Sequence, residues 1–116
     1  MKENVIRDKS FAFAVRVVNL YKHLTTEQKE YVMSKQVLRS GTAIGAMVRE
    51  SQHAESRADF AHKLAIAQKE ANETAYWLEL LHASAYLADL AFESLTADCT
   101  ELQKLLASIL ISSKQK

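Results

Sequence analysis

The sequence predicts an all-α protein, an up-down-up-down antiparallel four-helix bundle, and three observations support this fold class. Apolar residues recur at helical spacing along almost the whole chain. The 116 residues contain no proline and two glycines, which leaves little of the turn chemistry that an all-β or α/β protein needs. The expected connections are about two or three residues long, and such short loops force consecutive helices to pack as antiparallel neighbours.

The first helix is expected at about residues 4–24 and the second at about residues 26–54. The apolar side chains of the first follow one another at steps of four, three and four, which is the spacing of one helical face. These side chains are Phe13, Val17, Leu20 and Leu24. The run "TTEQKE" then resembles a helix start, because Thr25 and Gln28 fit a capping box.

The third helix is expected at about residues 57–87, where Ser56 and Asp59 have the spacing of a second N-terminal cap. Its apolar positions alternate steps of four and three. They are Phe60, Leu64, Ala67, Ala71, Thr74, Leu78, Leu81 and Ala85. The fourth helix is expected at about residues 89–113, beginning at Asp89. A chain of this length is one domain by size, so residues 1–116 are expected to form a single bundle.

The charge balance argues against a strongly basic nucleic-acid binder, because fifteen Lys and Arg face fourteen Asp and Glu. The first 25 residues are the exception, with five basic and two acidic side chains. No secretory signal and no run of eighteen apolar residues is present, so we expect a cytoplasmic protein without membrane contact. Cys99 is the one cysteine and cannot form an intrachain disulfide.

Both glycines lie within the expected second helix, where each costs about 1 kcal/mol relative to alanine. Gly41 and Gly45 are four residues apart and therefore share one helical face. We expect a neighbouring helix or a large side chain to pack closely on this face, with Tyr76 and Trp77 as the large side chains. The alternative is the close approach of a ligand or of another backbone.

The register of the second and third helices predicts an ion pair. Antiparallel helices that meet near residues 55 and 56 place Arg39 between Glu70 and Glu73. We interpret the pair as a device that fixes helix register rather than as a large source of stability. A phosphate is the alternative partner for Arg39 and for Lys35, which lies one turn before it.

Two Glu-x-x-His pairs match the ligand motif of di-metal bundles, namely Glu50 with His53 and Glu79 with His82. The same register separates the two glutamates by roughly 27 Å, so they cannot share one metal site within a subunit. The sequence also lacks a phosphate-binding glycine loop and a nucleophile elbow. We therefore expect no metal, no cofactor and no enzymatic activity.

A basic stripe runs along the expected first helix, since Lys2, Lys9, Arg16 and His23 recur every seven residues. Such a stripe either follows a nucleic-acid backbone or pairs with acidic side chains across a helix interface. The sequence leaves both interpretations open.

The segment "RSGTAIGAMVRESQHAESRADFAHKLAIAQKEANETAYWLELL", from Arg39 to Leu81, closely resembles the four-helix-bundle family first noticed as proteins encoded in intervening sequences of bacterial 23S rRNA genes. The resemblance implies a ring-like homopentamer without known catalytic activity. A related branch, the accessory proteins of diversity-generating retroelements, is associated with nucleic acid and a reverse transcriptase. The wide apolar arcs of the first and third helices also favour a homo-oligomer.

These observations predict a non-enzymatic oligomeric bundle that acts as a nucleic-acid-associated accessory protein, with RNA or DNA as its partner. The candidate contact residues are Lys2, Lys9, Arg16, Lys35, Arg39 and Arg49. The alternative is a scaffold that binds a protein partner and makes no nucleic-acid contact.

Overall fold

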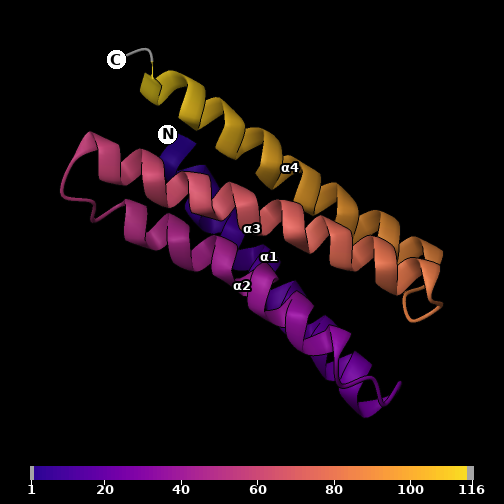
Figure 1. The fold of residues 1–116 in the computed structure, drawn as a ribbon. Coiled ribbons are helices and arrows are strands. Elements are labelled where there is room, and N and C mark those ends of the chain that lie inside the picture. The colour runs from indigo at the N-terminus through magenta and orange to yellow at the C-terminus, as the bar shows by residue number, and fades with distance from the viewer. Residues whose placement is uncertain (1, 115–116) are drawn as a thin grey trace.

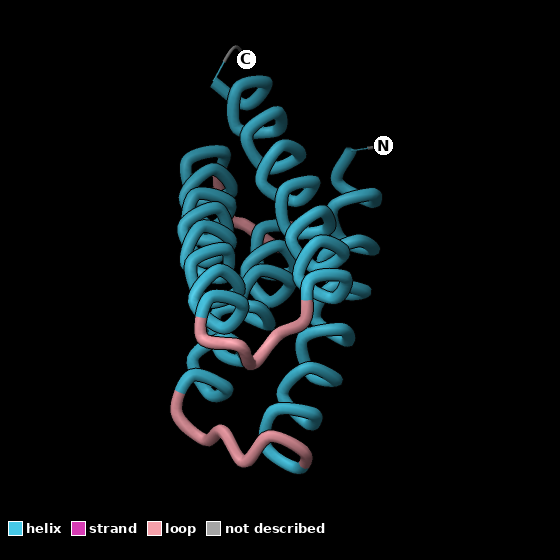
Figure 2. Tube along the Cα trace, turned by 90° about the vertical axis from the view of Figure 1, so that its right-hand side faces the viewer, coloured by secondary structure: helices cyan, strands magenta, loops and turns pink. Residues whose placement is uncertain are grey.

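A computed structural model gives the fold of residues 2–114 and the side chains of residues 4–114. The helices are α1 (Lys2–Thr26), α2 (Met33–Ser51), α3 (Arg57–Ala83) and α4 (Asp89–Lys114). Consecutive helices pack against one another and α1 also contacts α4, which closes an antiparallel bundle of 47 × 21 × 19 Å (Figure 1). The predicted fold class is therefore confirmed. The two ends of the described chain lie at the same end of the bundle (Figure 2).

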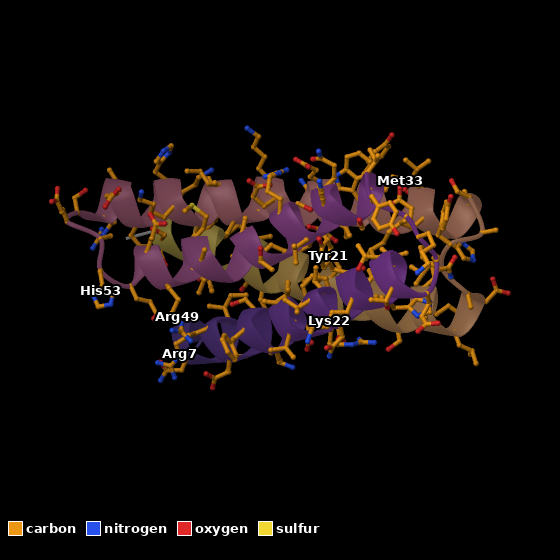
Figure 3. The ribbon with its side chains drawn as sticks, turned by 90° about the horizontal axis from the view of Figure 1, so that it is seen from below. Arg7, Tyr21, Lys22, Met33, Arg49 and His53 are labelled. Carbon is orange, nitrogen blue, oxygen red and sulfur yellow. The ribbon has the colours of Figure 1, made fainter. Side chains whose placement is uncertain are left out.

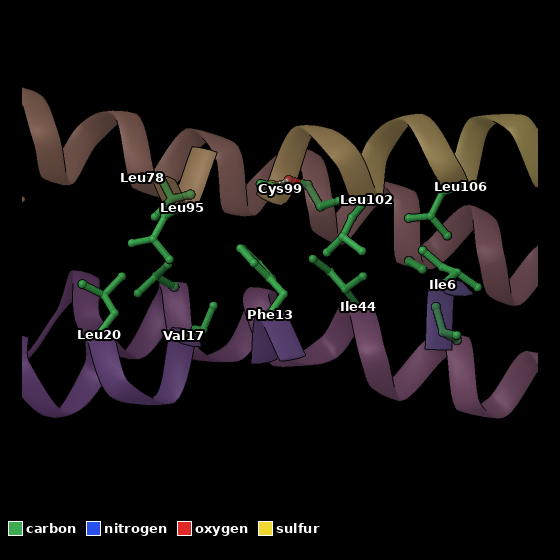
Figure 4. Packing of buried hydrophobic residues seen from close by; sticks show 14 of the residues in the cluster. Ile6, Phe13, Val17, Leu20, Ile44, Leu78, Leu95, Cys99, Leu102 and Leu106 are labelled. Carbon is green, nitrogen blue, oxygen red and sulfur yellow. Dashed lines mark hydrogen bonds between the residues drawn. The ribbon is translucent and has the colours of Figure 1, made fainter. Parts of the chain in front are cut away.

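The core is built from one apolar face of each helix (Figure 4). Val17, Ile44, Leu78 and Leu106 are each fully buried at its centre. Truncating a side chain of this kind to alanine typically costs about 2–5 kcal/mol, so the core supplies much of the bundle's stability. Within residues 2–114, no helix has both the length and the apolar character needed to cross a bilayer.

The first turn differs from the prediction, because Thr25 does not cap α2. Helix α1 continues through Thr26, and the Thr25 hydroxyl donates to the backbone carbonyl of Tyr21 at 2.9 Å. Lys29 then adopts a left-handed backbone conformation, with φ at 55°. As a result α2 begins at Met33, seven residues later than expected.

Glu30 caps α2 in place of Thr25. Its carboxylate accepts hydrogen bonds from the backbone amides of Val32 and Met33 at 3.1 Å and of Ser34 at 2.7 Å. Burial alone would raise the pKa of Glu30, but these amide bonds together outweigh burial and hold the pKa below its ordinary value. A charged acceptor that satisfies three amides outcompetes a hydroxyl that satisfies one, which explains why the predicted capping box is wrong.

The cap predicted for α3 is confirmed. The Ser56 hydroxyl accepts from the backbone amide of Asp59 at 3.0 Å, and the Asp59 carboxylate accepts from the amide of Glu55 at 3.3 Å. Helix α2 ends at Ser51 and not at residue 54, so the connection to α3 is longer than expected.

Helix α3 ends at Ala83, four residues before the predicted end. Ala85 takes a left-handed conformation with φ at 67°, and the amide of Tyr86 donates back to the carbonyl of Leu81 at 2.9 Å. This is the pattern of a Schellman motif, in which glycine is the usual left-handed residue. Alanine in that position gave no sequence signal for the end of the helix.

The glycines pack closely, as predicted, but against α1 and not against Tyr76 or Trp77. A Cβ atom on Gly41 would lie 2.8 Å from both γ carbons of Val17, and one on Gly45 would lie 3.4 Å from the carbonyl oxygen of Ser10. The predicted register gives the level of a residue along the helix but not its direction around the axis. Both glycines point toward α1, so the partner predicted for them on α3 is wrong.

Candidate functional site

Arg39 lies between the two glutamates that the register selects. Its Nη1 atom is 3.3 and 3.2 Å from the two carboxylate oxygens of Glu70, and its Nη2 atom contacts Glu73. Glu73 also accepts from the indole N–H of Trp77 at 2.9 Å. The hydrogen bond from Trp77 and then that from Arg39 lower the pKa of Glu73. The guanidinium is thus already paired with two carboxylates, and a phosphate would have to displace them.

Tyr76 lies beside this network rather than in the core. Its side chain is 55% exposed and meets the Trp77 ring edge-on, with ring centres 5.0 Å apart. Trp77 itself is half-buried and packs against the core. Under the network, the hydroxyls of Thr74 and Ser40 share a buried hydrogen bond of 2.9 Å, which fixes the register of α2 on α3.

The basic stripe of α1 faces α4. The Lys9 ammonium is 3.0 Å from Glu101, and the Arg16 guanidinium is 2.7 Å from Asp98. Arg16 also donates to the Ser94 hydroxyl at 3.0 Å. These cations therefore pair across a helix interface, which was one of the two interpretations of the stripe. The side chain of Lys2 lies outside the described residues.

A second set of cations has no acidic partner. Among the described Lys and Arg side chains of α1 and α2, Lys22, Lys35 and Arg49 are exposed and form no ion pair with a carboxylate. Figure 3 shows Lys22 and Arg49, together with Arg7, on the outward surface that α1 and α2 share. Lys35 is an exposed residue in the first turn of α2. We call this surface the α1/α2 face. Its defining residues are Arg7, Phe11, Val15, Lys22, Lys35 and Arg49.

The α1/α2 face carries an exposed aromatic ring next to two arginines. Phe11 is 58% exposed, and the Arg49 guanidinium carbon lies 5.6 Å from the centre of its ring. Arg7 precedes Phe11 by one helical turn and so lies on the same side of α1. The Arg7 Nε atom is also 3.2 Å from the carboxylate of its neighbour Asp8, an exposed pair that water screens strongly.

Arg7 also lines an open groove of about 470 Å³ at the end of the bundle where α2 connects to α3. The other residues of this groove are Asn4, Ser51, Gln52, Ala54, Ser56 and Phe60. Most of these side chains are polar, so the hollow beside Arg7 is lined mainly by polar groups.

The α1/α2 face belongs to the basic half of the chain. Residues 1–54 contain nine Lys and Arg against five Asp and Glu, whereas residues 55–116 contain six against nine. Sequence reasoning found Lys35 and Arg49 but missed Arg7, Phe11 and Lys22. The sequence does contain a signal for this surface. Arg7, Phe11 and Val15 follow one another at four-residue spacing, on the side of α1 away from its buried residues.

The Glu-x-x-His pairs are engaged elsewhere. The Glu50 carboxylate pairs with Lys63 at 3.1 Å. His82 lies 2.7 Å from Asp89 and stacks on the ring of Phe92 with centres 4.1 Å apart. Among the residues that the structure describes, no three His, Cys, Asp or Glu side chains gather where they could hold a metal ion.

Cys99 is buried against α3, where its Sγ atom lies 3.4 Å from the carbonyl oxygen of Ala71. Burial raises the pKa of this thiol to about 11. Because the thiolate is the reactive form of cysteine, Cys99 acts in packing and not as a nucleophile in the folded protein.

Comparison with known proteins gives two matches. The profile of the family described as "23S rRNA-intervening sequence protein" matches residues 2–108. Among solved structures, the chain is similar to the crystal structure of a protein with unknown function from the S23 ribosomal protein family of Bacteroides thetaiotaomicron. The two are 63% identical with a TM-score of 0.94, over 95% of this chain and 98% of that chain. A search of the curated proteins finds no match.

Proposed function

The chain belongs to the 23S rRNA-intervening sequence protein family, and from that premise we propose that it is a non-enzymatic helical bundle that associates with nucleic acid through the α1/α2 face. The observation that carries the proposal is the contrast among its cations. Arg16 and Arg39 are paired with carboxylates, whereas Lys22, Lys35 and Arg49 are not. Cations without acidic partners bind phosphate without first breaking an ion pair.

Few phosphate contacts imply weak binding that depends on salt. Affinity falls as salt is added, and the steepness of log affinity against log salt concentration is called the salt slope. Each phosphate that a protein neutralises adds about 0.7 to this slope for a single strand and about 0.9 for a duplex. Three cations therefore predict a slope of about 2 to 3. Binding of this kind fits an accessory protein better than a sequence-specific regulator, because phosphates carry no sequence information.

The experiment is a fluorescence anisotropy titration of labelled RNA at about 50 mM and about 200 mM salt. The wild-type protein is compared with a variant that combines Lys22→Ala, Lys35→Ala and Arg49→Ala. A matched control combines Lys69→Ala, Lys104→Ala and Lys114→Ala, which removes the same charge from exposed positions on α3 and α4.

We expect the wild-type affinity to fall with added salt, the first variant to lose most binding, and the control to keep it. An equal loss in the two variants would mean that net charge, and not the α1/α2 face, governs binding. If the wild-type protein does not bind RNA, or binds it with an affinity that does not change with salt, the proposed function is rejected.

We also propose that the chain forms a closed ring of identical subunits, as the sequence resemblance implies. Leu90 is 82% exposed and Ile111 is 59% exposed, and both lie on α4. Large exposed apolar side chains are typical of interaction surfaces. Contacts at α4 leave the α1/α2 face open to a nucleic acid. Native mass spectrometry tests the ring: a pentamer that dissociates on Leu90→Lys supports it, and a monomeric wild-type protein rejects it.

Binding of a protein partner is the second candidate function, and the turn between α1 and α2 favours it. Tyr31 is 54% exposed and Val32 is 72% exposed there, which leaves an apolar tip at one end of the bundle. Affinity capture after nuclease treatment distinguishes the two functions. A protein that stays bound to the wild type and is lost with Tyr31→Ser supports the scaffold.

A further inference from the structure

The α1/α2 face combines an exposed aromatic ring with arginine side chains. We infer that it binds unpaired nucleotides, with a base stacked on the ring of Phe11 and the adjacent phosphates held by Arg7 and Arg49. The inference rests on the proposed function and adds to it the strandedness of the ligand and the residue that reads it.

Phe11 is placed to stack with an incoming base. The buried face of α1 is filled by Phe13 and Val17, so the core does not use the Phe11 ring. The ring is 58% exposed, and the Arg49 guanidinium lies over one face of it, 5.6 Å from the ring centre. Stacking on an exposed aromatic ring accepts any base, because every base has a π face.

The four cations of the face lie at two heights along the bundle, with one cation from α1 and one from α2 at each height. Phe11 contacts Arg49, and Gly41 lies against Val17, so residues of these antiparallel helices are level when their numbers sum to about 58. Arg7 is thus level with Arg49, and Lys22 is level with Lys35. Fifteen residues of helix separate Arg7 from Lys22, which is roughly 22 Å at 1.5 Å per residue.

Two exposed apolar side chains of α1 lie between the two pairs of cations. They are Phe11 and Val15, and Val15 is 47% exposed. A duplex hides the faces of its bases within the stack and presents phosphates at regular intervals, so charged backbone would lie over these apolar side chains. An unpaired strand can instead turn a base toward Phe11 and its phosphates toward the cations. The polar groove next to Arg7 provides room for the flanking nucleotide.

The test uses the full chain and two labelled probes, an oligouridine strand and a blunt RNA duplex of the same length. Phe11→Leu keeps the apolar bulk but removes the π face, whereas Phe11→Trp keeps the π face. Tyr76→Leu is the matched control, because Tyr76 is a similarly exposed aromatic residue on α3. Thermal unfolding of each variant verifies the fold, and the exposure of Phe11 predicts an unchanged midpoint.

We expect the wild type to prefer oligouridine over the duplex. Phe11→Leu should weaken oligouridine binding at least about fivefold, which is the lower end of the effect of one lost stacking contact. Phe11→Trp and Tyr76→Leu should bind as the wild type does. The indole fluorescence that Phe11→Trp adds should be quenched when oligouridine binds.

Two outcomes overturn the inference but leave the proposed function standing: tighter binding of the duplex, or oligouridine binding that Phe11→Leu does not change. Absence of indole quenching in a Phe11→Trp variant that binds oligouridine also overturns it. If the wild type binds neither probe in a salt-sensitive way, the proposed function fails and the inference fails with it.

Discussion

Helix α1 meets its two neighbours in different ways. Toward α4 it presents Lys9 and Arg16, which pair with Glu101 and Asp98. Toward α2 it packs against a glycine, since Gly41 lies against Val17. Pairs of long charged side chains border the first interface, whereas in the second a glycine lies directly against a side chain of α1.

A basic residue remains able to bind a phosphate where no acidic side chain of a neighbouring helix pairs with it. Helix α4 contains the acidic residues that face α1, whereas the one acidic residue within α2 is Glu50, which pairs with Lys63 of α3. Lys22, Lys35 and Arg49 therefore have no carboxylate partner, and Arg7 pairs with its exposed neighbour Asp8. The type of residue and its helix do not decide this; the side chains on the neighbouring helix do.

The largest effect on stability is expected at the two glycines, where substitution by alanine should change the free energy of unfolding in opposite directions. Gly41→Ala places a methyl group 2.8 Å from the γ carbons of Val17, a side chain with a stiff χ1 angle. Overpacking of about 1–3 kcal/mol should exceed the gain in helix propensity of about 1 kcal/mol. Gly45→Ala meets its nearest atom at an ordinary 3.4 Å and should stabilise the protein by up to about 1 kcal/mol.

Urea unfolding of the two alanine variants measures the free energy of unfolding for each. If Gly41→Ala is as stable as Gly45→Ala, the close approach of α1 and α2 at Val17 is not what the glycine at position 41 provides.

The next effect concerns the turn that joins α1 to α2. Glu30→Gln removes the charge that three amides stabilise, and should lower the free energy of unfolding at pH 7 by about 1 kcal/mol. Because the pKa of Glu30 is lowered by folding, its contribution is complete above its unfolded pKa and is lost as pH falls through the folded pKa. The wild type and Glu30→Gln should therefore converge in stability in acid. A gap between them that stays constant down to low pH would show that the charge of Glu30 plays no part.

The smallest effect is expected at the interface with α4. Arg16 and Asp98 are 38% and 46% exposed, and exposed ion pairs contribute at most about 1 kcal/mol. Arg16→Gln should therefore shift the free energy of unfolding by about 0.5 kcal/mol, less at high salt. A double-mutant cycle with Asp98→Asn isolates the pair. A coupling free energy well above about 1 kcal/mol would mean that charge, and not apolar packing, holds α1 to α4.

The features that the sequence predicts correctly have local or repeated signals. The cap at Ser56 depends on residues three positions apart, and the apolar spacing identifies each helix over many turns. Arg39 could be placed because acidic residues lie on both sides of its predicted level on α3. None of these inferences needs the direction of a residue around its helix.

The features that sequence reasoning misses depend on that direction or on competition between groups. Gly41 and Arg39 lie two residues apart on α2 but face different helices, which the register alone does not reveal. Glu30 caps α2 in place of Thr25, because its carboxylate accepts hydrogen bonds from more backbone amides than a hydroxyl does. To predict the contact of Arg49 with Phe11, one must know the register of α1 against α2, and no sequence motif indicates that register.

The most direct test compares the two sides of α1 by the salt dependence of RNA binding. One variant combines Lys35→Ala with Arg49→Ala, and the other combines Lys9→Ala with Arg16→Ala, so both lose two positive charges. We predict that the first pair lowers the slope of log affinity against log salt for a single strand by about 1.4, and that the second leaves the slope unchanged. A slope that falls for the Lys9 and Arg16 variant and stays constant for the Lys35 and Arg49 variant would contradict this prediction.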